Sequence, residues 1–109
     1  KDFWLFVSQQ IDGFKNLPYS DPIAINILFV MPRPKIHFRT GKYKYLLKDN
    51  APRKHRTKPD IDNLIKFVLD AIQGHDKIFI DDSQVYEIKA VKRYCEEDEC
   101  PATYVEISS

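Results

Sequence analysis

The sequence predicts an α+β fold: a two-layer α/β sandwich in which a mixed sheet of about four strands has its helices packed mainly on one face. Two observations lead to this expectation. Segments with the two-residue alternation of strands flank one segment with a strong helical period, and the predicted helices are too few to cover both faces of a sheet. With 109 residues, the chain is expected to form a single domain, residues 1–109.

The first predicted element is a helix from Phe3 to about Lys15. It is indicated by apolar residues at helical spacing, namely Trp4, Val7, Ile11 and Phe14. Pro18 cannot continue a helix, so the element is expected to end near Asn16. Because the first residue is Lys1 rather than methionine, we expect the natural protein to begin earlier.

A strand and a long basic loop follow. Ile23–Val30 alternates between an apolar face and a mixed face, which predicts a strand near the centre of the sheet. Pro32–Lys58 is interrupted by three prolines and Gly41, so we expect a loop with a short ordered turn around Tyr43–Leu47.

The clearest periodic signal predicts an amphipathic helix. Its apolar positions recur at offsets of three and four residues and are Ile61, Leu64, Ile65, Val68, Leu69 and Ile72. Asp60 occupies the expected N-cap position, and Gly74 the position of a left-handed residue after the helix.

The remaining elements are strands. Lys77–Ile80 predicts a short strand or turn, and Gln84–Tyr94 a longer strand. Cys95–Pro101 is expected to be an acidic hairpin tip, after which Thr103–Ile107 forms the closing strand.

Charge is distributed unevenly along the chain, whose formal net charge is +1. Residues 32–58 contain one acidic residue, Asp49, and ten basic residues: Arg33, Lys35, Arg39, Lys42, Lys44, Lys48, Arg53, Lys54, Arg56 and Lys58. A cationic segment interleaved with aromatic residues favours binding to nucleic-acid phosphates, because each neutralised phosphate releases counterions. The alternative is a solvated loop that only aids solubility.

Two pairs of aspartates are candidates for catalysis. Asp60 and Asp62 begin the predicted helix, where acids also serve as caps, and Asp81 and Asp82 form a turn that helix capping does not explain. If the pairs converge, their repulsion favours a hard divalent cation such as Mg²⁺, which prefers oxygen ligands. Lys66 lies one turn after Asp62, either as an ion-pair partner or as a cation that reaches the scissile phosphate.

Other classes of site lack support in the sequence. No paired His/Cys arrangement indicates zinc, and the three histidines, which show no partner pattern, are expected at the surface. Cys95 and Cys100 are expected to be free thiols. No apolar run is long enough to cross a membrane and no leader is visible, which favours a cytoplasmic protein.

The strings KPDIDNLIKFVLDAIQG and FIDDSQVYEIKAVKRY resemble the core of the RusA-type crossover junction endodeoxyribonucleases. They contain an Asp-x-Asp-Asn helix start, a lysine four residues after the second Asp, and Asp-Asp-x-Gln-Val before a strand. The resemblance covers Met31 to about Ile107. It differs from the usual pattern in a longer basic loop and in the absence of a strand and basic loop ahead of the first helix.

The resemblance implies a function and a set of site residues. It implies a homodimeric, intracellular enzyme of bacterial or phage type that uses Mg²⁺ or Mn²⁺ to cut branched DNA, such as four-way junctions, in recombination and repair. The metal would be bound by Asp60, Asp62 and Asp82, with Asp81 as a neighbouring acid and Lys66 as the essential lysine. The alternatives are a non-catalytic DNA-binding module that uses the loop at 32–58, and a nuclease for RNA or flaps.

Overall fold

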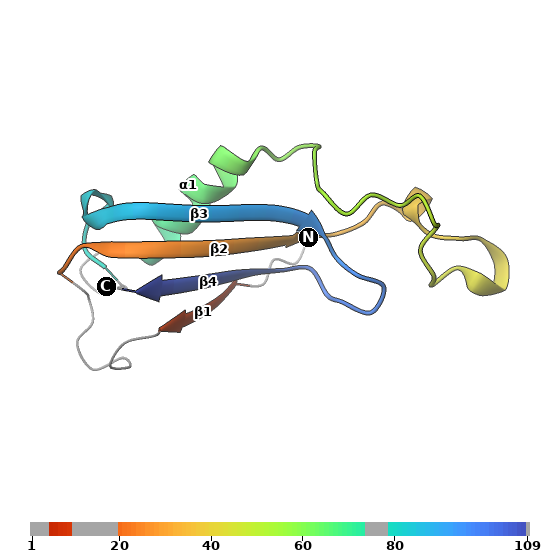
Figure 1. Cartoon of the computed structure of the whole chain (residues 1–109), viewed down its shortest axis with the longest axis horizontal. Coiled ribbons are helices and arrows are strands. Elements are labelled where there is room, and N and C mark those ends of the chain that lie inside the picture. The colour runs from red at the N-terminus through yellow and green to blue at the C-terminus, as the bar shows by residue number, and fades with distance from the viewer. Residues whose placement is uncertain (1–4, 10–19, 74–78, 109) are drawn as a thin grey trace.

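The computed structural model describes residues 5–9, 20–73 and 79–108, which form a mixed sheet with one α-helix on one face (Figure 1). The sheet has the order β1-β4-β2-β3, where the strands are β1 (Leu5–Gln9), β2 (Ile23–Met31), β3 (Val85–Tyr94) and β4 (Ala102–Ser108). β2 is parallel to β3 and antiparallel to β4, and β1 is parallel to β4. The predicted α+β class with a mixed sheet is therefore confirmed.

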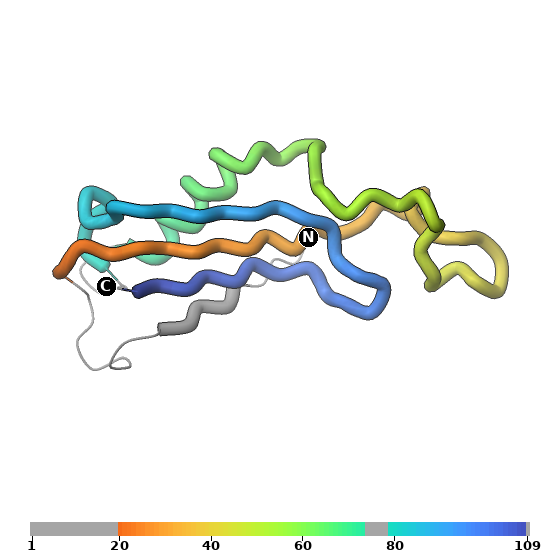
Figure 2. The backbone as a smooth tube through the Cα atoms, viewed as in Figure 1, coloured from red at the N-terminus to blue at the C-terminus, as the bar shows by residue number. Residues whose placement is uncertain are grey.

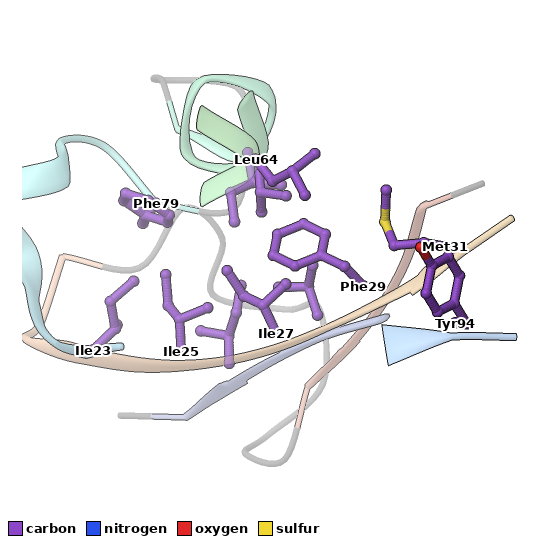
Figure 3. Close-up of a cluster of buried hydrophobic side chains, with 12 residues drawn as sticks. Ile23, Ile25, Ile27, Phe29, Met31, Leu64, Phe79 and Tyr94 are labelled. Atoms are coloured by element: carbon purple, nitrogen blue, oxygen red, sulfur yellow. The ribbon is translucent and has the colours of Figure 1, made fainter. Parts of the chain in front are cut away.

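β2 is the central strand because one of its faces is almost entirely aliphatic or aromatic. Ile23, Ile25, Ile27 and Phe29 are at most 3% exposed, and Figure 3 shows them pointing towards Leu64 and Phe79. Burying one such side chain stabilises the fold by about 1.5–3 kcal/mol. The strand predicted at Ile23–Val30 is confirmed and extends by one residue.

The helix α1 (Ile61–Ile72) packs on this face, as the apolar period predicted. Leu64, Val68 and Ile72 are its buried residues, each four positions after the last, so they form one stripe against β2. The helix ends at Ile72 and is followed by Gln73, whose backbone is extended; the predicted role of Gly74 lies outside the described residues.

The prediction of a helix at Phe3–Lys15 is wrong for residues 5–9, which form β1 and pair in register with β4. The apolar residues of this segment include β-branched and aromatic types, which also suit a strand. Pairing with the edge of β4 satisfies the backbone N–H and C=O groups, and this tertiary contact outweighs the local period. The rest of the predicted helix lies outside the described residues.

One further prediction for the C-terminal half needs correction, and another falls only partly within the described residues. Cys95–Pro101 is not a hairpin tip, because β2 lies between β3 and β4 and the segment crosses the end of β2. The most apolar strand takes the central position and separates its two neighbours. Of the short strand or turn predicted at Lys77–Ile80, Phe79 forms an isolated bridge with Gln73, and residues 77 and 78 lie outside the described ranges. The strand Thr103–Ile107 is confirmed within β4.

The basic segment 32–58, which we call the arm, projects from the end of the sheet where β2 finishes (Figure 2). It contains two short 3₁₀ turns, η1 (Lys35–His37) and η2 (Gly41–Tyr43), and a bridge between Phe38 and Leu47. Gly41 has a φ of 71°, which glycine adopts without strain. The predicted loop with an ordered turn is confirmed, and it accounts for the elongated dimensions of the molecule, 53 × 24 × 21 Å.

Candidate metal centre and nucleic-acid interface

Asp60 and Asp62 lie at the start of α1 and are both exposed. Asp60 has the extended backbone of an N-cap residue, but its side chain caps no helical N–H. Its Oδ2 instead lies 3.1 Å from the Nζ of Lys58, in an ion pair whose side chains are 51% and 85% exposed. An exposed pair of this kind contributes little stability, so capping does not account for the Asp60 carboxylate.

Asp81 and Asp82 begin the third 3₁₀ turn, η3 (Asp82–Gln84), immediately before β3. The Asp81 side chain accepts a hydrogen bond from the Ser83 N–H, and the Gln84 Oε1 accepts from the Asp81 N–H at 2.9 Å. This reciprocal arrangement is a capping box. The expectation that capping explains neither acid is therefore wrong for Asp81, and Asp82 is the residue without that role.

The two carboxyl groups of this turn are electrostatically linked. A side-chain hydrogen bond between them lowers the pKa of Asp81 and raises the pKa of Asp82. Asp82 is exposed, and some loss of solvation together with the charges of Asp81 and Asp70 raises its pKa further. A shared proton, or a cation placed beside the turn, would relieve the repulsion between these two carboxyl groups.

The two acidic pairs lie at opposite ends of the β2–β3 pair. Leu64, in the first turn of α1, lines the same cavity as Tyr94, the last residue of β3. Asp82 instead precedes β3, whose ten residues span roughly 30 Å. The reason is topological: β2 and β3 are parallel, so the connecting chain must return along the sheet, and α1 makes that return.

The pairs therefore do not converge within one chain. Over residues 20–73 and 79–108, no three His, Cys, Asp or Glu side chains are grouped so that they could hold a metal ion. Asp82 is instead close enough to Asp70, two helical turns beyond Asp62, to be affected by its charge. Lys66 lies between Asp62 and Asp70 in the sequence and is exposed on α1.

The acidic segment after β3 braces the arm. The guanidinium of Arg33 donates to the carbonyl oxygens of Cys95 and Pro52 at 2.6 and 2.7 Å. Glu97 accepts from the Leu47 N–H at 2.8 Å, and Glu96 pairs with Arg53. The sequence signal for this contact is the run of four acids opposite the basic segment.

The cations predicted to bind DNA fall into two groups. Four of them have partners within the chain: Arg33 through the bonds above, Arg39 with Asp49, Arg53 with Glu96, and Lys58 with Asp60. The others are exposed and form no ion pair with any described residue; they are Lys35, Lys42, Lys44, Lys54 and Arg56. This second group has its charges available for an external anion.

Sequence reasoning missed a cluster at the foot of the arm. His55 is only 9% exposed and His37 is half-buried, so the expectation of surface histidines is wrong for both; His75 lies outside the described residues. Both rings pack on Tyr94, with centroid separations of 4.7 Å for His37 and 4.8 Å for His55. No spacing in the sequence indicates this contact, because the three residues come from distant segments.

Two smaller predictions have clear outcomes. Cys95 and Cys100 are free thiols, as expected, with Cys95 buried and Cys100 exposed. Within the described residues, no helix combines the length and apolar character needed to cross a membrane.

Comparison with known proteins gives a family match over nearly the whole chain. The model of the family described as endodeoxyribonuclease RusA matches residues 3–108. The chain is 34% identical over 88 residues to the uncharacterized protein YqaN of Bacillus subtilis (strain 168). That alignment covers 81% of this chain and 60% of the relative, so the chain spans less than two thirds of YqaN. No solved structure matches the chain.

Proposed function

This chain belongs to the RusA endodeoxyribonuclease family, and on that premise we propose that it resolves four-way Holliday junctions by Mg²⁺-dependent hydrolysis of two phosphodiester bonds. Such an activity serves DNA recombination and repair. The observation that carries the proposal is the start of α1, where Asp60 and Asp62 are exposed and the Asp60 carboxylate is not used in capping. They stand beside an arm with five exposed cations that have no ion-pair partner among the described residues.

The donor set suits a hard cation. Asp60, Asp62 and Asp82 offer only carboxylate oxygens, and Mg²⁺ is commonly held by one or two carboxylates together with waters and substrate phosphates. Mn²⁺ has similar preferences and would substitute. The bound metal would supply an activated water and neutralise charge on the phosphate.

We place the metal site between two copies of the chain. Asp60 and Asp62 lie at one end of the β2–β3 pair and Asp82 at the other, so one chain does not bring all three to one ion. In a two-fold dimer, the start of α1 in one copy would face η3 of the partner copy, with Asp81 beside the site. The same symmetry would give two sites, which suits paired cuts in a junction of two-fold symmetry.

The chain's own cations have two roles in this proposal. Lys66 follows Asp62 by one turn, so its ammonium would offset the charge that the scissile phosphate gains during hydrolysis. The exposed cations of the arm would bind the phosphates of the junction's strands, independently of base sequence.

Replacing Asp62 with Asn should reduce nicking by about 100-fold or more, because a metal ligand is lost. Junction binding should change little, since a carboxylate does not attract phosphates. The measurement is the rate of nicking of a synthetic four-way junction across a Mg²⁺ titration, with a gel shift for binding. Glu87→Gln removes an exposed acid from β3 and is the matched control, with the wild-type rate expected.

Two results would contradict the proposal. Nicking by Asp62→Asn at the wild-type rate would show that this carboxylate holds no essential metal. A wild-type protein that shifts the junction in a salt-sensitive manner but yields no product at any Mg²⁺ concentration would be a DNA-binding module instead.

A further inference from the structure

A cavity of about 650 Å³ lies where the end of β2, the foot of the arm and the start of α1 meet. This volume falls within the range of pockets that hold small organic ligands, about 300–1,000 Å³. Its apolar lining includes Met31, Pro59 and Leu64, and its polar lining includes His37, His55 and Lys58. None of these apolar or histidine residues belongs to the proposed metal site.

The two histidines give the cavity hydrogen-bonding walls without charge. Burial and neighbouring cations lower the pKa of both rings, so they are neutral near pH 7. The Nδ1 of His37 lies 3.3 Å from the Nη1 of Arg33, and since an arginine only donates, that Nδ1 accepts. The remaining nitrogen of His37, Nε2, then carries the proton and is a donor.

His55 adds a second imidazole ring to the lining of the same cavity. Its Nε2 lies 3.3 Å from the Thr57 hydroxyl, whereas its Nδ1 is buried with no partner among the described residues. Because that nitrogen has almost no accessible surface, a ligand in the cavity would contact the rest of the His55 ring.

The position of the cavity limits what it can hold. Lys58 and Pro59 line it and immediately precede Asp60, so the cavity adjoins the carboxylates proposed to bind the metal. Lys58 and Arg33 bring positive charge to its lining, while the apolar walls disfavour a bare phosphate. A flat group with apolar faces and polar edges, linked to a phosphate, matches this combination.

We infer that the cavity takes one unstacked nucleobase of the DNA strand whose phosphate lies at the start of α1. The inference rests on the proposed function for the position of that strand. Bases beside a branch point or mismatch are removed from their stack more easily than bases within a continuous duplex. The cavity would therefore make cleavage depend on a base next to the cut, read through His37 and His55.

The test replaces, one at a time, each nucleotide around the branch point of a synthetic four-way junction with an abasic site. Binding is measured by gel shift without Mg²⁺, so that no cutting is required. Wild-type protein should lose about tenfold in affinity at one position, which corresponds to about 1.4 kcal/mol. His37→Ala should bind intact and abasic junctions equally.

Two further variants make this result specific. Met31→Phe adds bulk to the cavity lining without changing its charge, so it should also abolish the tenfold loss of affinity at the abasic position. Because Met31 lies outside the arm, this variant separates base binding from damage to the arm. Lys44→Ala, on the exposed part of the arm, should weaken binding to every junction alike and leave the tenfold difference between intact and abasic junctions unchanged. Thermal melting of each variant confirms that it is folded.

The outcomes separate this inference from the proposed function. If no abasic position weakens wild-type binding, no base occupies the cavity. The same conclusion follows if folded His37→Ala and Met31→Phe both keep the full tenfold difference in affinity between intact and abasic junctions. A loss of affinity at one abasic position, without Mg²⁺-dependent nicking, would support the base-binding cavity and refute the nuclease. Mg²⁺-dependent nicking without any loss of affinity at an abasic position would support the nuclease and refute the base-binding cavity.

Discussion

Arg93 and Glu99 join the end of β3 to the acidic segment that braces the arm. The Arg93 guanidinium donates to both carboxylate oxygens of Glu99, at 2.8 and 3.0 Å, and the Glu96 N–H donates to Oε1 at 2.9 Å. The hydrogen bonds from Arg93 lower the pKa of Glu99 to about 2. Charge-assisted bonds of this bidentate kind are stronger than ordinary surface ion pairs.

This pair should make stability depend on pH in acid. Since folding lowers the pKa of Glu99 from 4.5 to about 2, the pair's contribution is fully present above pH 4.5 and lost as the pH falls towards 2. Glu99→Gln should lower the free energy of unfolding at pH 7 by about 1–3 kcal/mol. The same substitution should also make the free energy of unfolding depend less on pH between 4.5 and about 2.

Urea denaturation at a series of pH values measures this effect. Asp98→Asn removes a charge from the same segment without breaking these bonds, so it should keep the wild-type pH dependence. If the free energy of unfolding of Glu99→Gln fell with decreasing pH as steeply as that of the wild type, another carboxylate would dominate acid denaturation.

At the level of single residues, the sequence indicated chemical type better than surroundings. The Asp-x-Asp-Asn start of α1 identified exposed acids, because local spacing determines which residues begin a helix. It could not show that Asp60 pairs with Lys58, that Asp81 caps η3, or that His37 and His55 meet at Tyr94. These contacts depend on the folded chain rather than on spacing.

Among the elements, α1 and β2 were predictable because each buries one face with a clear period, whereas β1 was not. Val7 lies at helical spacing from Trp4 and Ile11 in the sequence but also at strand spacing from Leu5, and pairing with β4 decides in favour of the strand. The arm was predictable as a loop from its prolines. Its ordered form comes from the acidic segment at 96–99, which lies more than forty residues away along the chain.

The arm should account for much of the salt dependence of DNA binding. Lys42 and Lys44 are exposed, and each ammonium lies 5.2 Å from the ring centroid of the tyrosine that follows it. If each lysine binds one phosphate, Lys42→Ala/Lys44→Ala should reduce the slope of log K against log salt by about 2, or about 0.9 per contact.

Gel shifts at several salt concentrations give this slope. Lys89→Ala removes an exposed cation from β3, away from the arm, and should leave the slope unchanged. Equal slopes for the double variant and the wild type would show that Lys42 and Lys44 do not bind phosphates.

At the scale of the whole molecule, the separation of the acidic pairs gives the strongest constraint on the active site. The spacing of the motif could not reveal it, because it follows from the parallel pairing of β2 and β3 and the return path of α1. A site within one chain would require η3 to move most of the length of β3. A site between two copies requires only a two-fold axis.

Mixing two inactive variants distinguishes these arrangements. Asp62→Asn and Asp82→Asn should each be inactive alone. In a mixed dimer with shared sites, one site combines Asp62 of the second copy with Asp82 of the first and is intact, while the other site lacks both acids. After random exchange of subunits, about a quarter of all sites would be intact, so nicking should return to about a quarter of the wild-type rate. The products should be single nicks rather than paired cuts, because no dimer holds two intact sites. If each chain held its own metal, every site in the mixture would lack one acid and no nicking would return, which would place Asp62 and Asp82 of the same chain on one ion.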